Sequence, residues 1–123
     1  MKKVSYILFV AIFTFSCSTR EAKKSNDTAA EVATIEKGQE LFESNNCIAC
    51  HKVDQKVVGP SLQETAKIYK EKNGDLVAFL KEEAQPLVDE TLYETMKINL
   101  QITKTMLDAE LESLEMYILS HSK

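Results

Sequence analysis

The chain has 123 residues, of which 44% are hydrophobic, and a formal net charge of −4 at pH 7. This length suggests a single domain. The acidic balance, with no basic run interleaved with aromatic residues, argues against a nucleic-acid partner and favours partners that present a basic docking face.

The first predicted element is a signal peptide at residues 1–16. Two lysines precede an apolar run over residues 4–15, and a serine follows it. A basic start, a short apolar run and a small residue before the cleavage point are typical of an export signal. The run is shorter than the roughly 17–25 residues of a membrane span, so an uncleaved anchor or a buried helix is only the alternative. Cleavage would remove two of the 15 basic residues and none of the 19 acidic ones, giving a net charge of about −6.

Cys17 follows the apolar run and a small residue, which resembles the cleavage site of bacterial lipoproteins. The resemblance implies cleavage before Cys17, lipid on its thiol and a further acyl chain on its new amino group, which together would anchor the protein to a membrane. Thr14 and Phe15 depart from the usual pattern, and ordinary cleavage nearby would leave a soluble exported protein instead. The polar stretch at residues 17–30 is expected to form a flexible tether that holds the domain on the periplasmic side of the membrane.

Residues 31–123 are predicted to form the folded domain, because their apolar residues follow helical spacing and no segment shows sustained strand alternation. Ser61 and Asp75 are residue types that begin helices, Asn73-Gly74 marks a break, and Pro86 ends a segment. The predicted helices cover residues 34–46, 61–72, 76–84, 89–96 and 107–121.

The last predicted helix has the strongest apolar face. Leu107, Leu111, Leu114 and Ile118 fall on one stripe, with Tyr117 beside it. About 93 residues of short helices nevertheless make a thin core. A buried cofactor would supply apolar contact area that the side chains lack.

The pentapeptide Cys-Ile-Ala-Cys-His begins at Cys47, and this spacing is the attachment signature of c-type haem. Cys47 and Cys50 can reach the two vinyl groups on one side of a porphyrin, and His51 then lies under the iron as the proximal ligand. A thioredoxin-like dithiol would require a βαβ setting, which is not visible here. A zinc site would require a second ligand pair, for which only Cys17 and His121 remain. We therefore expect one covalent, thioether-linked haem c.

The stretch "GQELFESNNCIACHKVDQKVVGPSL", residues 38–62, resembles the small bacterial class I mono-haem cytochromes c. The resemblance implies an all-α class I cytochrome c fold, with three to five short helices around one covalently bound haem. It also implies that the N- and C-terminal helices cross at Gly38, with Phe42 near Tyr117. By the same resemblance, the Pro60 carbonyl accepts a hydrogen bond from the ligand histidine, and Leu62 lies against the haem.

The family takes its sixth iron ligand from a methionine in the C-terminal half. Met116 points away from the apolar stripe of the last helix, and Met106 is better placed as an apolar contact at the start of that helix. Met96 is expected on a loop and is followed three residues later by Asn99, a spacing common in the family. Lys97 replaces the proline that usually follows the ligand. We predict Met96 as the sixth ligand and keep Met106 as the alternative.

These features predict an electron carrier rather than an enzyme. With both axial positions filled, the iron exchanges single electrons and has no position for substrate. The expected partners are a redox donor and a redox acceptor of a membrane respiratory chain. Two alternatives are kept: a haem sensor or peroxidase-type enzyme with an open sixth position, and an electron-transfer subunit of a larger oxidoreductase.

Overall fold

The computed structural model describes residues 32–123. The predicted signal peptide at residues 1–16, the predicted lipidated Cys17 and the tether at residues 17–30 lie outside the described residues. Within residues 32–123, no helix has both the length and the apolar character needed to cross a membrane.

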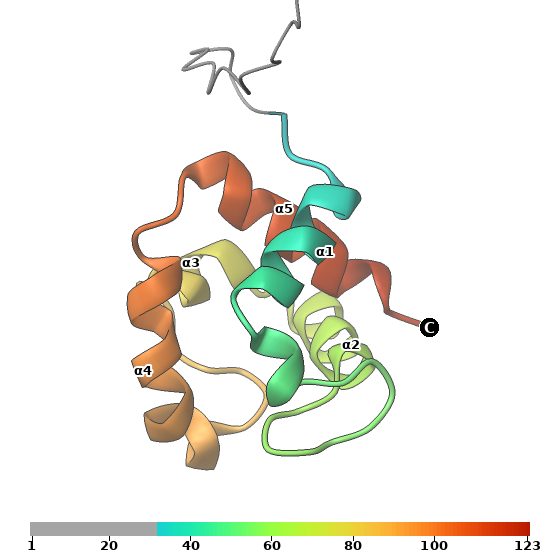
Figure 1. The fold of residues 1–123 in the computed structure, drawn as a ribbon. Helices are drawn as coiled ribbons and strands as arrows, with labels where there is room; N and C mark the ends of the chain where they lie inside the picture. Colours follow the sequence, from blue (N-terminus) through green and yellow to red (C-terminus); the bar gives the residue numbers. More distant parts are fainter. Residues whose placement is uncertain (1–31) are drawn as a thin grey trace, which may run out of the picture.

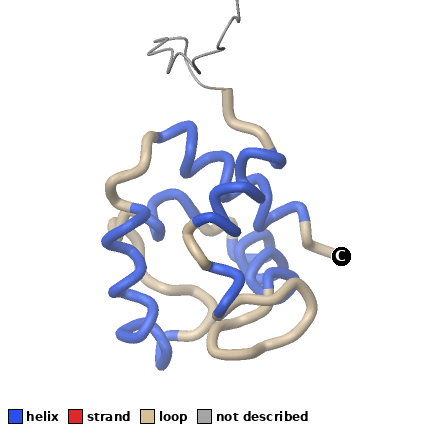
Figure 2. The backbone as a smooth tube through the Cα atoms, in the orientation of Figure 1, coloured by secondary structure: helices blue, strands red, loops and turns tan. Residues whose placement is uncertain are grey.

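Five α-helices and two 3-10 helices make up the described part of the chain, which contains no strand (Figures 1 and 2). The predicted all-helical architecture is confirmed, although α3 ends earlier than expected and α4 begins and ends later. In chain order the elements are α1 (Ile35–Ser44), η1 (Cys47–Ala49), α2 (Leu62–Lys72), α3 (Leu76–Leu80), η2 (Glu90–Leu92), α4 (Tyr93–Thr103) and α5 (Asp108–Ser120).

The first and last helices cross in close contact (Figure 1). A Cβ atom added at Gly38 would lie 2.7 Å from the Cβ of Tyr117 and closer still to the carbonyl oxygen of Ser113. The Thr34 amide donates to the Ser113 hydroxyl over 3.2 Å, and the rings of Phe42 and Tyr117 lie 5.5 Å apart. Glycine is required at position 38 because any side chain would separate the two helices.

The helices that flank the site begin where the sequence predicts. The side chain of Ser61 accepts from the amide of Glu64 at the start of α2, and that of Asp75 accepts from Ala78 at the start of α3. Asn73 ends α2 in the left-handed conformation, with φ at 50°. The helices enclose one apolar core, which comprises Leu41, Phe42, Leu62, Tyr69, Leu76, Leu80, Leu100, Leu111, Leu114 and Ile118.

Three details differ from the sequence-based expectation. Helix α3 ends at Leu80 rather than near residue 84, because Glu82 adopts a left-handed conformation that turns the chain toward α4. Helix α4 continues to Thr103, where the hydroxyl donates to the Leu80 carbonyl over 2.6 Å. Leu107 is 62% exposed because it is the extended residue that precedes α5 and therefore lies outside its buried stripe.

Candidate functional site

A single tight turn brings together the two cysteines and the histidine of the pentapeptide. Asn46 adopts the left-handed backbone conformation, with φ at 59°, and so turns the chain away from the direction of α1. The amides of Cys50 and His51 both donate to the Cys47 carbonyl, over 3.2 and 3.0 Å. This local hydrogen bonding forms η1 and brings the side chains of Cys47, Cys50 and His51 together on one turn.

The ring of His51 is oriented by the loop that follows it. Its Nδ1 donates to the Pro60 carbonyl over 2.8 Å, as the resemblance implied. The Gly59 amide donates to the Cys50 carbonyl over 2.9 Å, which brings the loop back against the turn. Because a carbonyl can only accept, this bond places the proton on Nδ1 and leaves Nε2 as the atom able to bind a metal.

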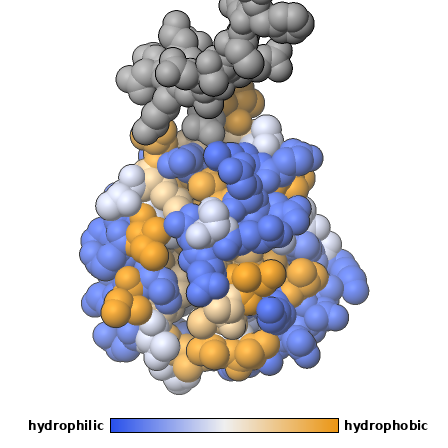
Figure 3. Space-filling view, in the orientation of Figure 1, coloured by the Kyte–Doolittle hydropathy of each residue, from blue (hydrophilic) through white to orange (hydrophobic). Residues whose placement is uncertain are grey.

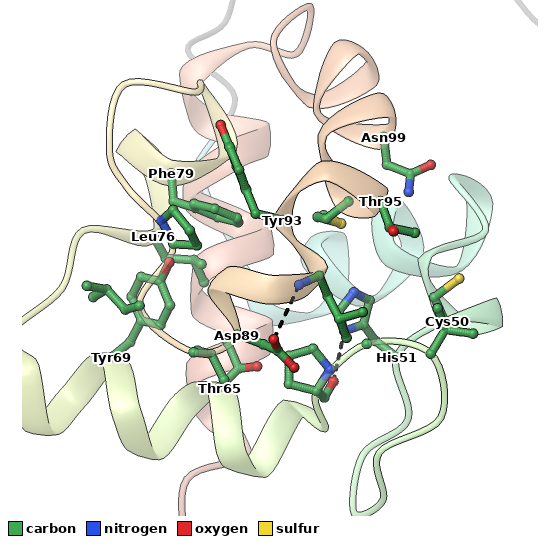
Figure 4. Close-up of a pocket in the computed structure, with 18 residues that line it drawn as sticks. Cys50, His51, Thr65, Tyr69, Leu76, Phe79, Asp89, Tyr93, Thr95 and Asn99 are labelled. Atoms are coloured by element: carbon green, nitrogen blue, oxygen red, sulfur yellow. Dashed lines mark hydrogen bonds between the residues drawn. The ribbon is translucent and has the colours of Figure 1, made fainter.

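Two adjoining hollows meet at this turn, and Figure 4 shows the residues that line the smaller one. They contain about 680 and 980 Å³ of space outside protein atoms, part of it open to solvent. Cofactor sites in proteins commonly have mostly apolar walls with a few polar groups. Both hollows are lined by Cys50, His51, Thr65, Leu76, Phe79, Met96 and Asn99.

Apart from the residues that they share, the two hollows are lined by different parts of the chain. The larger one is lined by apolar core residues, among them Leu62, Leu114 and Ile118, and by the Cys47 side of the turn. The smaller one carries the polar atoms of Tyr69 and Asp89, together with residues of the loop that precedes η2. The residues present therefore fit a largely apolar cofactor held through two thiols and one imidazole.

The three candidate methionines take very different positions. Met96 lies in the second turn of α4 and lines both hollows together with His51. Asn99 follows one helical turn later on the same side, and Figure 4 shows it projecting from α4 beside the site. Met106 packs against the core and is absent from both linings, whereas Met116 is 42% exposed. The expectation that Met96 would occupy a loop is wrong, because α4 extends past it.

Few charged side chains line the two hollows. Burial raises the pKa of the Cys47 thiol, and burial together with nearby Asp75 raises the pKa of Tyr69 to about 12. The hydrogen bond from Lys56 lowers the pKa of Asp89 to about 2. Among the described residues that line the two hollows, Asp89 is the one carboxylate, and none is a lysine or arginine.

Sequence reasoning missed the polar residues of the smaller hollow. Asp89 was seen only as the start of a short helix, although its side chain also lines the site and accepts from Lys56 over 2.7 Å. Tyr69 and Tyr93 resembled ordinary helix residues in the sequence. Only Asp89 carried a recognisable signal, since an aspartate before a helix accepts hydrogen bonds from that helix's first amides.

Apolar side chains remain exposed beside the turn. Ile48, Val53, Val57 and Val58 are between 40% and 50% exposed. Figure 3 shows apolar surface on the face where η1 and the following loop lie. This group forms a rim next to the site, so the pocket opens onto a partly apolar surface.

Comparison with known proteins agrees with this geometry. Residues 35–122 match the cytochrome c family. The chain is 53% identical over 34 residues to cytochrome c-552 of Nitrosomonas europaea, a match that covers 28% of this chain and 33% of that protein. It is 50% identical over 38 residues to cytochrome c-551 of Stutzerimonas stutzeri, covering 31% and 36%, and 50% identical over 32 residues to cytochrome c-551 of Pseudomonas denitrificans, covering 26% and 39%.

The matched segments span little more than a third of the length of these relatives. The family match is much longer and includes every described helix from α1 to α5. Members of this family hold haem c covalently through cysteine thioethers, and Cys47 and Cys50 fit that motif. The chain belongs to the cytochrome c family.

Proposed function

We propose that this protein is a mono-haem electron carrier in which His51 and Met96 are the two axial ligands. The observation that carries the proposal is that His51 and Met96 line the same two hollows, while Pro60 fixes the histidine ring so that Nε2 is available. The haem supplies the chemistry, a one-electron change at its iron.

The chain's own residues hold the cofactor and set its environment. Cys47 and Cys50 bind it covalently, and Leu62, which is 2% exposed, excludes water from one wall. A thioether sulfur from Met96 favours the reduced iron and so raises the reduction potential. A filled sixth position leaves no place for substrate, which supports a carrier rather than an enzyme.

The proposed partners are a donor and an acceptor among membrane respiratory proteins. The apolar rim of Ile48, Val53, Val57 and Val58 supports docking beside the cofactor. The signal-like residues 1–16 and the lipoprotein-like Cys17 support export to the periplasmic side and attachment to a membrane through lipid. Mass spectrometry of the membrane-extracted protein should find one haem and an acylated Cys17. A mature chain without acyl groups would contradict the anchor but not the carrier.

The ligand assignment is tested by Met96→Ala with Met106→Ala as the matched control. Met96→Ala should keep haem attached, lose the weak long-wavelength absorption band of the ferric methionine–iron bond, and lower the potential. Met106→Ala should keep both properties, because Met106 lines neither hollow. If the wild type lacks the band and its reduced form binds carbon monoxide readily at neutral pH, the sixth position is open and the sensor or peroxidase alternative is favoured.

A further inference from the structure

One ion pair joins the two loops that flank the site. Lys56 Nζ lies 2.7 Å from Asp89 Oδ2, although the two residues are 33 positions apart in the sequence. Lys56 belongs to the loop that carries Gly59 and Pro60, whereas Asp89 belongs to the segment that enters α4. The Asp89 side chain is only 17% exposed, so solvent screens it less than a typical surface carboxylate.

Asp89 uses its second oxygen to hold the beginning of the next segment. Oδ1 accepts from the amides of Thr91 and Leu92, over 3.2 and 3.3 Å, and from the Thr91 hydroxyl over 2.6 Å. These bonds start η2, and η2 leads without a break into α4. The position of Asp89 therefore fixes the position of the helical turn that carries Met96.

Lys56 is fixed on the opposite side, next to the proximal histidine. Its backbone forms an antiparallel bridge with His51. The loop closes on itself through a bond from the Val57 amide to the Gly59 carbonyl, over 3.3 Å. The ion pair thus links Lys56, whose backbone is bridged to His51, with Asp89, which begins the segment that leads to Met96.

The half of α4 that carries Met96 has few other anchors. Its C-terminal half is held by Leu100, which is fully buried, by Thr103, and by the 2.7 Å ion pair of Lys104 with Glu82. None of residues 90–99 is buried, and Ile98 is 75% exposed. Besides the Asp89 bonds, the ring of Tyr93 contacts that of Phe79, and Tyr93 and Met96 pack partly buried against the core.

We propose that Lys56 and Asp89 are positioning residues that hold the first turns of α4 against the His51 loop and so determine how firmly Met96 stays bound to the iron. The proposal rests on Met96 being the sixth ligand, as proposed above. Removing the pair leaves the two cysteines, His51 and the apolar core untouched. The consequence is therefore confined to the methionine side of the site.

The test uses the ferric holoprotein and added imidazole, which replaces the methionine once Met96 has left the iron. At saturating imidazole, the loss of the methionine–iron band reports the departure rate. We expect Lys56→Gln and Asp89→Asn each to raise this rate about two- to fivefold, the range expected for a partly exposed ion pair. The double variant should add little to either single change, because both remove the same interaction.

Three controls separate positioning from general destabilisation. Lys56→Arg should show the wild-type rate, because arginine keeps the positive charge that pairs with Asp89. Lys67→Gln removes an exposed lysine whose partner Glu71 lies 3.9 Å away on α2, and should leave the rate unchanged. Thr34→Ala removes a helix-capping bond far from the site, and should lower the midpoint of unfolding without a matching change in rate. High salt should move the wild-type rate toward that of Lys56→Gln.

The following results would refute either the positioning role of Lys56 and Asp89 or the ligand assignment. If the Lys56→Gln rate equals that of the wild type at low salt, or if Lys67→Gln or Thr34→Ala raises the rate as much, the positioning role is refuted and the carrier function stands. If the methionine–iron band survives in Met96→Ala, the ligand assignment fails and this inference fails with it. The two failures are therefore distinguished by separate variants.

Discussion

Gly59→Ala should displace the ring of His51 without replacing any of the residues proposed to hold the haem. A Cβ atom at this position would lie 2.8 Å from both Nδ1 and Nε2 of His51, and closer still to Cε1. Favourable contacts between such atoms lie at about 3.5–4.0 Å, so the ring must move by roughly 0.7 Å or more. A movement of that size breaks the 2.8 Å bond from Nδ1 to the Pro60 carbonyl.

The size of the effect follows from three contributions. Forcing an extra carbon into a packed site costs about 1–3 kcal/mol, and loss of the hydrogen bond costs about 0.5–1.5 kcal/mol. Alanine also restricts the conformations of the unfolded chain, which adds about 0.4–1 kcal/mol to the free energy of unfolding and offsets part of this loss. This gain applies because Gly59 does not have a positive φ, which alanine would have to avoid. The free energy of unfolding should therefore fall by about 2 kcal/mol, which lowers the melting temperature by roughly 10 °C in a domain of this size.

The assay is chemical and thermal unfolding of the holoprotein, together with the visible spectrum of its haem. Gly74→Ala is the comparison variant, because its new Cβ would meet the end of Leu87 and, at 2.8 Å, the ring of Tyr69, but no atom of His51. Gly74→Ala should lose stability without displacing His51 and should therefore change the haem spectrum less than Gly59→Ala. The reasoning is refuted if Gly59→Ala unfolds at the wild-type midpoint, or if both alanine variants lose the same stability with unaltered spectra.

Two further predictions concern the helix crossing and the ion pair. Gly38→Ala should destabilise the fold by about 2 kcal/mol or more in urea unfolding, because the new Cβ would meet the backbone of Ser113. The gain in helix propensity of about 1 kcal/mol cannot offset the separation of the two helices. Equal or greater stability in the variant would contradict the close crossing. Asp89 has a pKa of about 2 in the folded chain against an ordinary 3.8, so its contribution to stability is present above about pH 4 and is lost as pH falls toward 2. The wild type should lose more stability than Asp89→Asn over that interval, and parallel pH profiles for the two proteins would rule out the bond from Lys56 as the cause.

The local features of the site could be predicted from the sequence because each depends on residues close together in the chain. The spacing of Cys47, Cys50 and His51 fixes one turn, and Ser61 and Asp75 cap helices through the amides three positions ahead. Periodicity also identified the buried positions Leu111, Leu114 and Ile118 of α5, which recur at helical intervals.

The parts that could not be predicted depend on contacts between distant segments. Leu107 continues the apolar interval of α5, but the helix begins one residue later and leaves this side chain outside. The end of α3 is determined by Glu82, which turns left-handed and pairs with Lys104 of a different segment. The pairing of Lys56 with Asp89 likewise requires the folded arrangement of two loops, which no local pattern encodes.

The hydrogen bond between Thr34 and Ser113 has a consequence for the order of events during maturation. These residues are 79 positions apart, and the amide of one cannot meet the hydroxyl of the other until nearly the whole polypeptide is available. In the folded chain burial raises the pKa of the free Cys47 thiol, and an unfolded chain lacks that burial, so the thiol ionises more readily before folding. The thiol is therefore more reactive toward haem attachment before the chain has folded.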